Sequence, residues 1–311
     1  MNTKSTIIVI VAALFSVPLL AQEPEKKQPP PPKPLPKAPA GILFERDVVY
    51  GKTGDVELKL NLARPETTDG PRPCVLVIHG GGWAAGDRIQ HDKNTWDFVQ
   101  RGYVSATIGY RFAPKYLFPA QVEDVKCAVR FLRANAEKFG IDPERFGAVG
   151  FSAGGHLSLM LGVMDKADGF EGDGGWADQS SKVQTVVNFF GPTDLTMEYP
   201  EASRGIVKNW IGGTMAEKPD AYKAASPVTY INTGDAPILS FQGTKDHLVP
   251  HNQVYRLTDV MTAAGVAGRA EFLVGAGHGA PLFDWQYTSN EMFAFFEKQL
   301  RPKKPAPKTA N

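Results

Sequence analysis

The sequence predicts an α/β fold: a mostly parallel central sheet with helices on both faces and an antiparallel hairpin at its N-terminal edge. Short, near-continuous apolar runs recur along the chain, as expected of strands that are buried on both faces. Segments with helical periodicity separate these runs, and this alternation is typical of a parallel sheet covered by helices. The first two runs instead flank a short glycine-containing turn, which predicts a hairpin.

The predicted strands begin with this hairpin, residues 45–50 and 56–63 around a turn at 51–54. Most of the later strands are rich in Val, Ile or Phe, and they span residues 74–79, 104–110, 146–151, 183–190, 237–241 and 270–274. Apolar residues at helical spacing predict helices at 121–139, 251–264 and 284–300, and a further helix at 152–163. Residues 165–182, rich in Gly and Asp without any period, predict a surface loop.

The two ends of the chain of 311 residues differ from the middle in composition. A basic start, an apolar run at 7–20 and the small residue Ala21 are typical of a cleaved secretory signal peptide at 1–21. A membrane anchor is the alternative, but the run is shorter than the ~20 apolar residues of a spanning helix. We therefore expect export, to the periplasm or outside the cell, with membrane contact only through the signal peptide.

Two polar segments flank the predicted folded domain at 41–301. Residues 22–40 form a Pro-rich linker, and residues 302–311 predict a disordered tail, since neither buries enough apolar surface to offset its ordering entropy. The formal net charge is +1 and the domain contains no basic block, so no nucleic-acid partner is expected. Cys74 and Cys127 fit either a disulfide of an exported protein or two buried thiols, and no zinc site.

The strongest chemical motif is GFSAG at 150–154, which fits the G-x-S-x-G nucleophile elbow. Ser152 falls where a predicted strand turns into a predicted helix, a crowded turn that needs small neighbours. The helix would hold the hydroxyl near its positive end. The alternative is a Gly-rich turn that only packs a helix onto a strand.

A second motif, HGGGW at 79–83, follows a predicted strand and suits an oxyanion hole. Glycines let backbone N–H groups approach an oxygen without a Cβ in the way, so we assign the donors to Gly81 and Gly82, joined by the N–H of Ala153. A phosphate-binding loop is the alternative, but its glycine spacing is missing. His79 is expected to be structural and to hydrogen-bond the loop.

A serine nucleophile needs a base and an acid that orients it. The expected base is His278, in the loop GAGHG at 275–279, in preference to His247 and His251. The expected acid is Asp246, in GTKDHLVP at 243–250, just past a strand end. Asp194 is the rival, one strand earlier, and its alternative role is to cap a turn.

Together with YRFAP (110–114) and FPAQVEDV (118–125), these motifs make residues 42–300 resemble the α/β-hydrolase superfamily. The chain is most similar to the HGGG-type esterase/lipase branch, which includes hormone-sensitive-lipase-like esterases and bacterial acetyl-xylan and feruloyl esterases. The resemblance implies the α/β-hydrolase fold and the roles assigned above to Ser152, Asp246 and His278. Arg111 and Asp124 match structural positions of the family, and an ion pair between them is a hypothesis.

Two departures from the hormone-sensitive-lipase-like pattern favour the secreted carbohydrate esterases. The acid lies in Gly-Thr-Lys-Asp246 rather than Asp-Pro-Leu-x-Asp, and Lys115 rather than Glu follows the YRFAP segment. Acetyl or feruloyl groups on xylan, or related short-acyl esters, are therefore the expected substrates. Trp83 and Trp285 are candidates to line an acyl or sugar pocket, with packing in the core or a cap as the alternative.

The expected activity is serine carboxylic-ester hydrolysis through an acyl-enzyme, which requires no metal or organic cofactor. The expected partner is an ester substrate, including acylated polysaccharide or its fragments. A serine peptidase or amidase is one alternative, because the same residues serve amides. A non-catalytic binding module on a hydrolase fold is another, although such modules lose the residues retained here.

Overall fold

The computed structural model describes residues 35–67, 69–280 and 282–301. The predicted signal peptide, residues 22–34 of the predicted linker and the predicted tail lie outside these residues. The chain divides after Lys37, and the fold described below belongs to the unit that begins at Ala38. Among the described residues, the helices are too short or too polar to cross a membrane.

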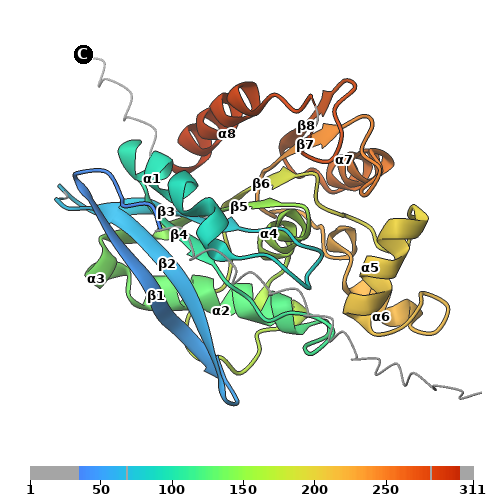
Figure 1. Cartoon of the computed structure of the whole chain (residues 1–311), viewed down its shortest axis with the longest axis horizontal. Coiled ribbons are helices and arrows are strands. Elements are labelled where there is room, and N and C mark those ends of the chain that lie inside the picture. Colours follow the sequence, from blue (N-terminus) through green and yellow to red (C-terminus); the bar gives the residue numbers. More distant parts are fainter. Residues whose placement is uncertain (1–34, 68, 281, 302–311) are drawn as a thin grey trace, which may run out of the picture. The chain divides into compact units, whose positions relative to one another are not determined.

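One eight-stranded sheet forms the centre of this unit, in the order β1-β2-β4-β3-β5-β6-β7-β8 (Figure 1). Its strands are β1 (Ile42–Thr53), β2 (Val56–Pro65), β3 (Arg72–Ile78), β4 (Val104–Ile108), β5 (Ile141–Phe151), β6 (Thr185–Phe189), β7 (Ile238–Gly243) and β8 (Gly268–Leu273). β2 pairs antiparallel with both β1 and β4, and all other neighbours are parallel. The predicted mostly parallel sheet with an antiparallel N-terminal hairpin is confirmed.

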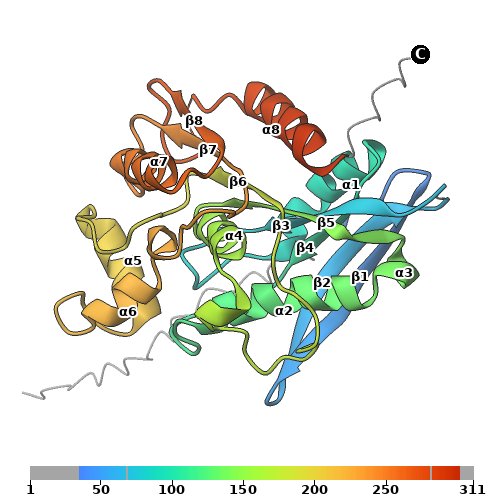
Figure 2. The same cartoon turned by 180° about the vertical axis from the view of Figure 1, so that it is seen from behind.

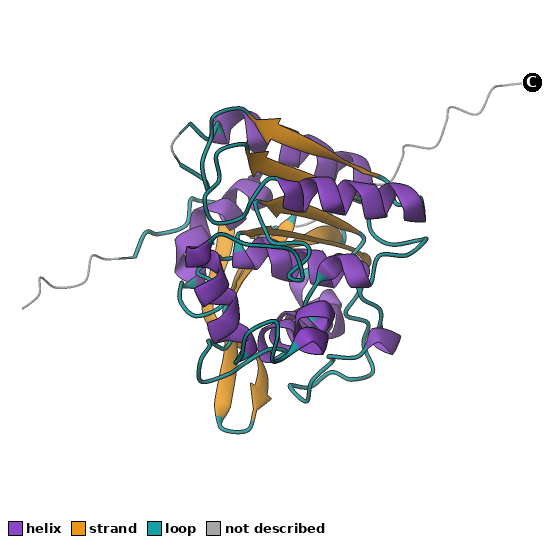
Figure 3. Cartoon of the chain, turned by 90° about the vertical axis from the view of Figure 1, so that its right-hand side faces the viewer, coloured by secondary structure: helices purple, strands orange, loops and turns teal. Residues whose placement is uncertain are grey.

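An apolar cluster covers each face of the sheet. Successive side chains of each central strand point to opposite faces and so join the two clusters in turn. In β3, Leu76 and Ile78 join one apolar cluster, whereas Val75 and Val77 join the other. Helices α2 (Ala120–Ala134), α4 (Ala153–Val163) and α7 (Asn252–Ala264) contribute to the first cluster, and α1 (Asp92–Gln100) and α8 (Trp285–Leu300) to the second. Figures 2 and 3 show helices on both sides of the strands.

The predicted helix at 121–139 is wrong in one respect, since it is broken into α2 and α3 (Ala136–Phe139). The break lies at Asn135, whose backbone N–H and side-chain Nδ2 both donate to the carbonyl of Phe131, at 3.1 and 2.9 Å. The backbone bond is the helical one, but Asn135 has non-helical dihedrals, φ −107° and ψ 21°, and its side-chain bond to the same carbonyl favours the end of α2 there.

The segment between β6 and β7 holds two helices that the sequence pattern did not predict, α5 (Glu201–Ile211) and α6 (Pro219–Ala224). α1 was likewise not predicted. The short 3₁₀ turns are η1 (Arg88–His91), η2 (Lys166–Asp168) and η3 (Pro227–Thr229). α5 matters most for function, because it covers one end of the cavity described below.

The predicted surface loop at 165–182 contains only η2 as regular structure. Glu171 in this loop pairs with Lys126, at 2.8 Å, and with Arg130, two buried cations of α2. These ion pairs fix the loop against the helix. Cys74 in β3 and Cys127 in α2 are both buried free thiols, the second of the two alternatives left open by the sequence.

Candidate active site

Ser152 lies at the turn between β5 and α4, where it has φ 55° and ψ −119°. A non-glycine residue with positive φ is strained and persists only where its surroundings determine it. Here the strand and the helix are packed so closely that a Cβ added to Gly150 would lie 2.1 Å from the carbonyl oxygen of Gly154. The predicted need for small residues at this turn is confirmed, and the turn raises the hydroxyl above the strand end.

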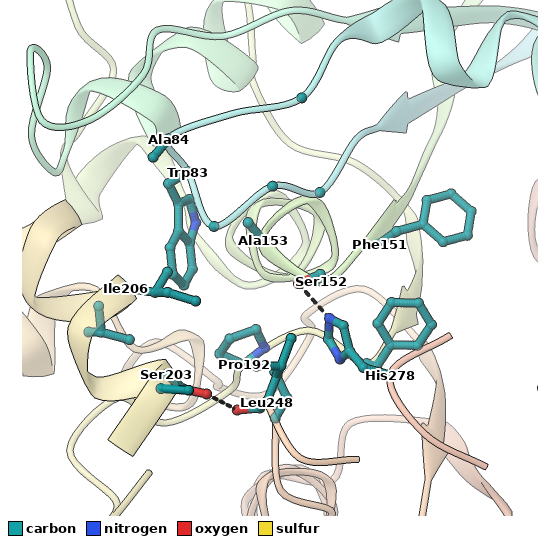
Figure 4. Close-up of a pocket in the computed structure, with 18 of the residues that line it drawn as sticks. Trp83, Ala84, Phe151, Ser152, Ala153, Pro192, Ser203, Ile206, Leu248 and His278 are labelled. Atoms are coloured by element: carbon teal, nitrogen blue, oxygen red, sulfur yellow. Dashed lines mark hydrogen bonds between the residues drawn. The ribbon is translucent and has the colours of Figure 1, made fainter. Parts of the chain in front are cut away.

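His278 joins Ser152 to Asp246 in one chain of hydrogen bonds. Its Nε2 lies 2.9 Å from Ser152 Oγ, and its Nδ1 lies 2.7 Å from Asp246 Oδ2. A carboxylate only accepts, so the neutral tautomer that satisfies both contacts has its proton on Nδ1 and accepts the serine proton at Nε2. Figure 4 shows His278 directed at Ser152.

Asp246 is buried, and its charge is compensated by hydrogen bonds from the chain that follows β7. Oδ1 accepts from the backbone N–H groups of Leu248 and Val249, at 2.8 and 2.9 Å. Oδ2 accepts from the side-chain amide of Gln242, at 3.0 Å, as well as from His278. These hydrogen bonds fix the carboxylate, which in turn holds the imidazole in one orientation.

The rival groups lie elsewhere. The carboxylate of Asp194 accepts a hydrogen bond from the backbone N–H of Thr196, at 3.0 Å, and so caps its own turn as the alternative predicted. It also forms an ion pair with Arg256, at 3.3 Å. His247 and His251 are both exposed, and His251 lies at the N-terminus of α7. Among the described residues, none of these three forms a hydrogen bond or ion pair with Ser152 or His278.

The glycine loop after β3 lies directly on the elbow. A Cβ on Gly80 would lie 2.8 Å from the carbonyl oxygen of Phe151, and one on Gly81 only 2.0 Å from that of Ala85. Gly81 and Gly82 have positive φ, and their N–H groups donate to no acceptor in the described part of the chain. Ala153 is the first residue of α4, so its N–H has no intrahelical acceptor either.

His79 and Tyr110 hold the glycine loop in place through hydrogen bonds and ring stacking. His79 Nδ1 lies 2.7 Å from the carbonyl oxygen of Gly80, the hydroxyl of Tyr110 donates to the carbonyl of His79 at 2.9 Å, and the two rings are stacked. Burial lowers the pKa of His79 to about 4, so the ring is neutral near pH 7. The predicted structural role of His79 is confirmed, as is the ion pair between Arg111 and Asp124, at 2.7 Å.

A cavity of about 890 Å³ opens in front of Ser152. The glycine loop, Ser152, Ala153 and His278 line one end, and α5 covers the other with Ser203, Ile206 and Val207. In Figure 4 Trp83 and Ile206 form a wall on the side away from Phe151. The walls are mainly apolar, so the cavity suits an uncharged group attached to the reacting carbonyl.

The two candidate tryptophans occupy different places. Trp83 is only 2% exposed and stacks on Trp210 with ring centroids 4.0 Å apart, so it belongs to the core while one edge lines the cavity. Trp285, at the start of α8, is 44% exposed and lines a second cavity beside His278. A role for either in substrate binding stays a prediction.

Sequence reasoning missed the residues that support the site from neighbouring elements. Gln242 could have been found, because a polar residue in the mainly apolar strand β7 indicates a buried hydrogen-bond partner. Ser203, whose hydroxyl donates to the carbonyl of Leu248 at 2.5 Å, links α5 to the segment after Asp246. No group of three or more His, Cys, Asp or Glu among the described residues is arranged to hold a metal ion.

The chain is similar to known carboxylic ester hydrolases. The BD-FAE family profile matches residues 60–261. Esterase LipC of Mycobacterium tuberculosis is 30% identical over 249 residues, which are 78% of this chain and 61% of LipC. Isoprenylcysteine alpha-carbonyl methylesterase ICME of Arabidopsis thaliana is 25% identical, over 75% of this chain and 55% of that protein. The chain thus spans less than two thirds of these curated relatives.

Solved esterase structures superimpose on most of this chain. A truncated carbohydrate esterase from gut microbiota superimposes with a TM-score of 0.74 and 29% identity, covering 83% of this chain and 96% of that one. Esterase 2 of Thermogutta terrifontis, with propionate bound, gives a TM-score of 0.70 and 27% identity, covering 85% and 97%. The same esterase phosphonylated by sarin gives 0.74 and 25%, covering 86% and 99%. Because the BD-FAE profile covers more than half of the sequence, the chain belongs to the BD-FAE family of α/β-hydrolases.

Proposed function

We propose that this protein is a serine carboxylic-ester hydrolase that acts through an acyl-enzyme. The observation that carries the proposal is the continuous hydrogen-bond chain from Ser152 through His278 to Asp246, with contacts of 2.9 and 2.7 Å. The esterase names of the relatives support it. So does the phosphonylation of the Thermogutta esterase by sarin, since organophosphates of this kind modify activated serines.

In the proposed reaction, Ser152 Oγ attacks the ester carbonyl while His278 Nε2 takes the hydroxyl proton. The carbonyl oxygen becomes an oxyanion that accepts from the N–H groups of Gly81, Gly82 and Ala153. His278 then gives the proton to the alcohol oxygen, the C–O bond breaks and the alcohol leaves. A water molecule, deprotonated by His278, attacks the acyl-enzyme, and the carboxylic acid leaves as Ser152 regains a proton.

The proposed substrates are short-acyl esters of hydroxylated alcohols, including acetyl or feruloyl groups on xylan. The carbohydrate esterase among the similar structures supports this class. The mainly apolar cavity in front of Ser152, which α5 lines on one side, supports an uncharged acyl group. We also propose that the protein is exported, on the evidence of residues 1–21.

The test compares the wild type with Ser152→Ala on p-nitrophenyl acetate. The wild type is expected to release nitrophenolate, and the variant to lose nearly all turnover because no nucleophile remains. Equal rates would reject Ser152 as the nucleophile. Acetylated xylan, methyl ferulate, long-chain esters and peptide amides, assayed in parallel, then rank the substrate classes.

A further inference from the structure

A second cavity, of about 520 Å³, adjoins the active site on the side of α8. It shares Gln90, His91, Phe151, Phe190 and His278 with the larger cavity, and helices α1 and α8 add Asn94, Trp285, Ser289 and Met292. Of the described residues, the three assigned oxyanion donors line only the larger cavity. The two cavities therefore meet at His278, and only the larger one contains the assigned oxyanion donors.

One wall of the second cavity is aromatic. Phe151 stacks on Phe189 with ring centroids 4.8 Å apart, and Phe189 stacks with Trp285 at 5.8 Å. A Cβ on Gly279 would lie 3.4 Å from the indole of Trp285, so this glycine allows the His278 loop to pack against the ring. Trp285 nevertheless keeps 44% of its surface uncovered, and so offers an apolar face to a ligand.

His91 supplies a polar atom beside this wall. Its ring stacks on Phe151, with centroids 4.6 Å apart and planes 4° from parallel, and its Nδ1 lies 3.0 Å from Asn94 Oδ1. An amide oxygen only accepts, so the proton lies on Nδ1 and Nε2 is an acceptor. Burial lowers the pKa of His91, which keeps the ring neutral near pH 7. Nε2 has no hydrogen-bond partner among the described residues and is not one of their enclosed polar atoms, and His91 lines both cavities.

The reaction geometry decides which half of an ester enters which cavity. In the tetrahedral intermediate, the oxyanion points to the glycine loop, and the alcohol oxygen must reach His278 Nε2 to receive its proton. The acyl group takes the remaining direction. Figure 4 shows Trp83 and Phe151 on opposite sides of the pair formed by Ser152 and His278. His278 lines both cavities, so it can also protonate an alcohol oxygen on the Phe151 side, away from the larger cavity that contains the oxyanion donors.

We propose that the second cavity binds the alcohol half of the ester, and that this alcohol is a hydroxylated ring such as a sugar unit. The apolar face of the ring packs on Trp285, and one of its hydroxyls donates to His91 Nε2. Gln90, Asn94 and Ser289 line the same space with further polar groups. The volume lies within the ~300–1,000 Å³ of small-molecule sites. This inference rests on the proposed function.

The experiment uses three esters that share an acetyl group: ethyl acetate, p-nitrophenyl acetate and a mono-acetylated xyloside. All three form the same acetyl-enzyme, so deacylation is common to them and kcat/KM compares only the steps in which the alcohol is still present. Trp285→Ala is expected to lower kcat/KM about tenfold for the xyloside and to leave ethyl acetate unchanged, because an ethyl group has no ring face to pack.

His91→Phe keeps a ring against Phe151 but removes Nε2. This variant is expected to lower kcat/KM for the xyloside by about tenfold, because one hydrogen bond to the alcohol is lost. The value of kcat/KM for p-nitrophenyl acetate should not change. The matched control is Tyr287→Ala, on the same helix as Trp285, which is 47% exposed and lines neither cavity. It should leave all three esters unchanged.

Equal losses on all three esters, or no loss on the xyloside in either variant, would overturn the alcohol site. A loss confined to p-nitrophenyl acetate would overturn the sugar assignment in favour of an aromatic alcohol. If the wild type hydrolysed none of the esters, or if Ser152→Ala matched it, the proposed function would itself be wrong. An active, Ser152-dependent enzyme without alcohol selectivity would instead refute only this inference.

Discussion

At the scale of single residues, the site depends on a strained serine whose partners are fixed by many contacts. The conformation of Ser152 costs about 1–3 kcal/mol. Close packing between β5 and α4 holds it, and the hydrogen bonds around Asp246 fix the imidazole that faces it. Both carboxylates considered from the sequence are buried, so burial alone did not separate them. Only the spatial position of His278 distinguishes Asp246 from Asp194.

The two carboxylates give a paired prediction. Asp246→Asn keeps the shape of the side chain but removes the charge that favours the Nδ1–H tautomer, and it is expected to lower kcat on p-nitrophenyl acetate by about 10³–10⁴. Asp194→Asn is the control, since its partners are Thr196 and Arg256, and kcat should stay within a fewfold. Steady-state kinetics on both purified variants decide it. A larger loss for Asp194→Asn would reassign the acid.

At the scale of elements, alternation of apolar runs predicted every strand of the sheet, because central strands are buried on both faces and leave a strong local pattern. α5 left a weaker one: within Glu201–Ile211 only Ser203, Val207, Trp210 and Ile211 are buried. Its place over the active-site cavity is set by tertiary packing. The second cavity could not be predicted from the sequence either, since five separate segments of the chain line it.

The contact between α4 and β3 predicts an effect on stability. A Cβ on Gly154 would lie 2.1 Å from the carbonyl oxygen of Ile78, and because this oxygen belongs to the backbone of the sheet, the helix must move away. Gly154→Ala is therefore expected to lower the free energy of unfolding by about 3 kcal/mol. Urea denaturation followed by circular dichroism measures this.

The matched control is Gly205→Ala in the interior of α5, where an added Cβ meets nothing within 4 Å. Alanine favours the helix there, so this variant should gain about 0.5–1 kcal/mol in the free energy of unfolding. Similar values for the two variants would show that the helix–strand packing is looser than described.

At the scale of the whole molecule, buried neutral histidines link folding to pH. His156 joins three parts of the fold: it lies in α4, it accepts from the indole N–H of Trp83 at 3.3 Å, and its Nε2 lies 2.7 Å from the carbonyl oxygen of Ala225. Burial lowers its pKa to about 4. An unfolded histidine titrates near pH 6.5. Between these values the unfolded chain binds a proton that the folded chain does not, so stability falls as the pH drops below about 6.5.

The resulting prediction concerns the free energy of unfolding at pH 7 and pH 5. The free energy of unfolding of the wild type should fall between pH 7 and pH 5. His156→Gln removes the titrating group, so this fall should be smaller by about 2 kcal/mol in the variant. His251→Gln is the control, because His251 is exposed. It should show the wild-type loss. The same pH dependence in all three proteins would mean that His156 does not stay neutral in the folded state.

The most direct test of the central claim is covalent labelling of the nucleophile. The protein is treated with diethyl p-nitrophenyl phosphate, and the modified peptide is identified by tandem mass spectrometry while esterase activity is followed. We predict one diethylphosphoryl group per chain, located on Ser152, with activity lost in proportion to labelling. A phosphoryl group on another residue, or full activity in a chain labelled at Ser152, would contradict it.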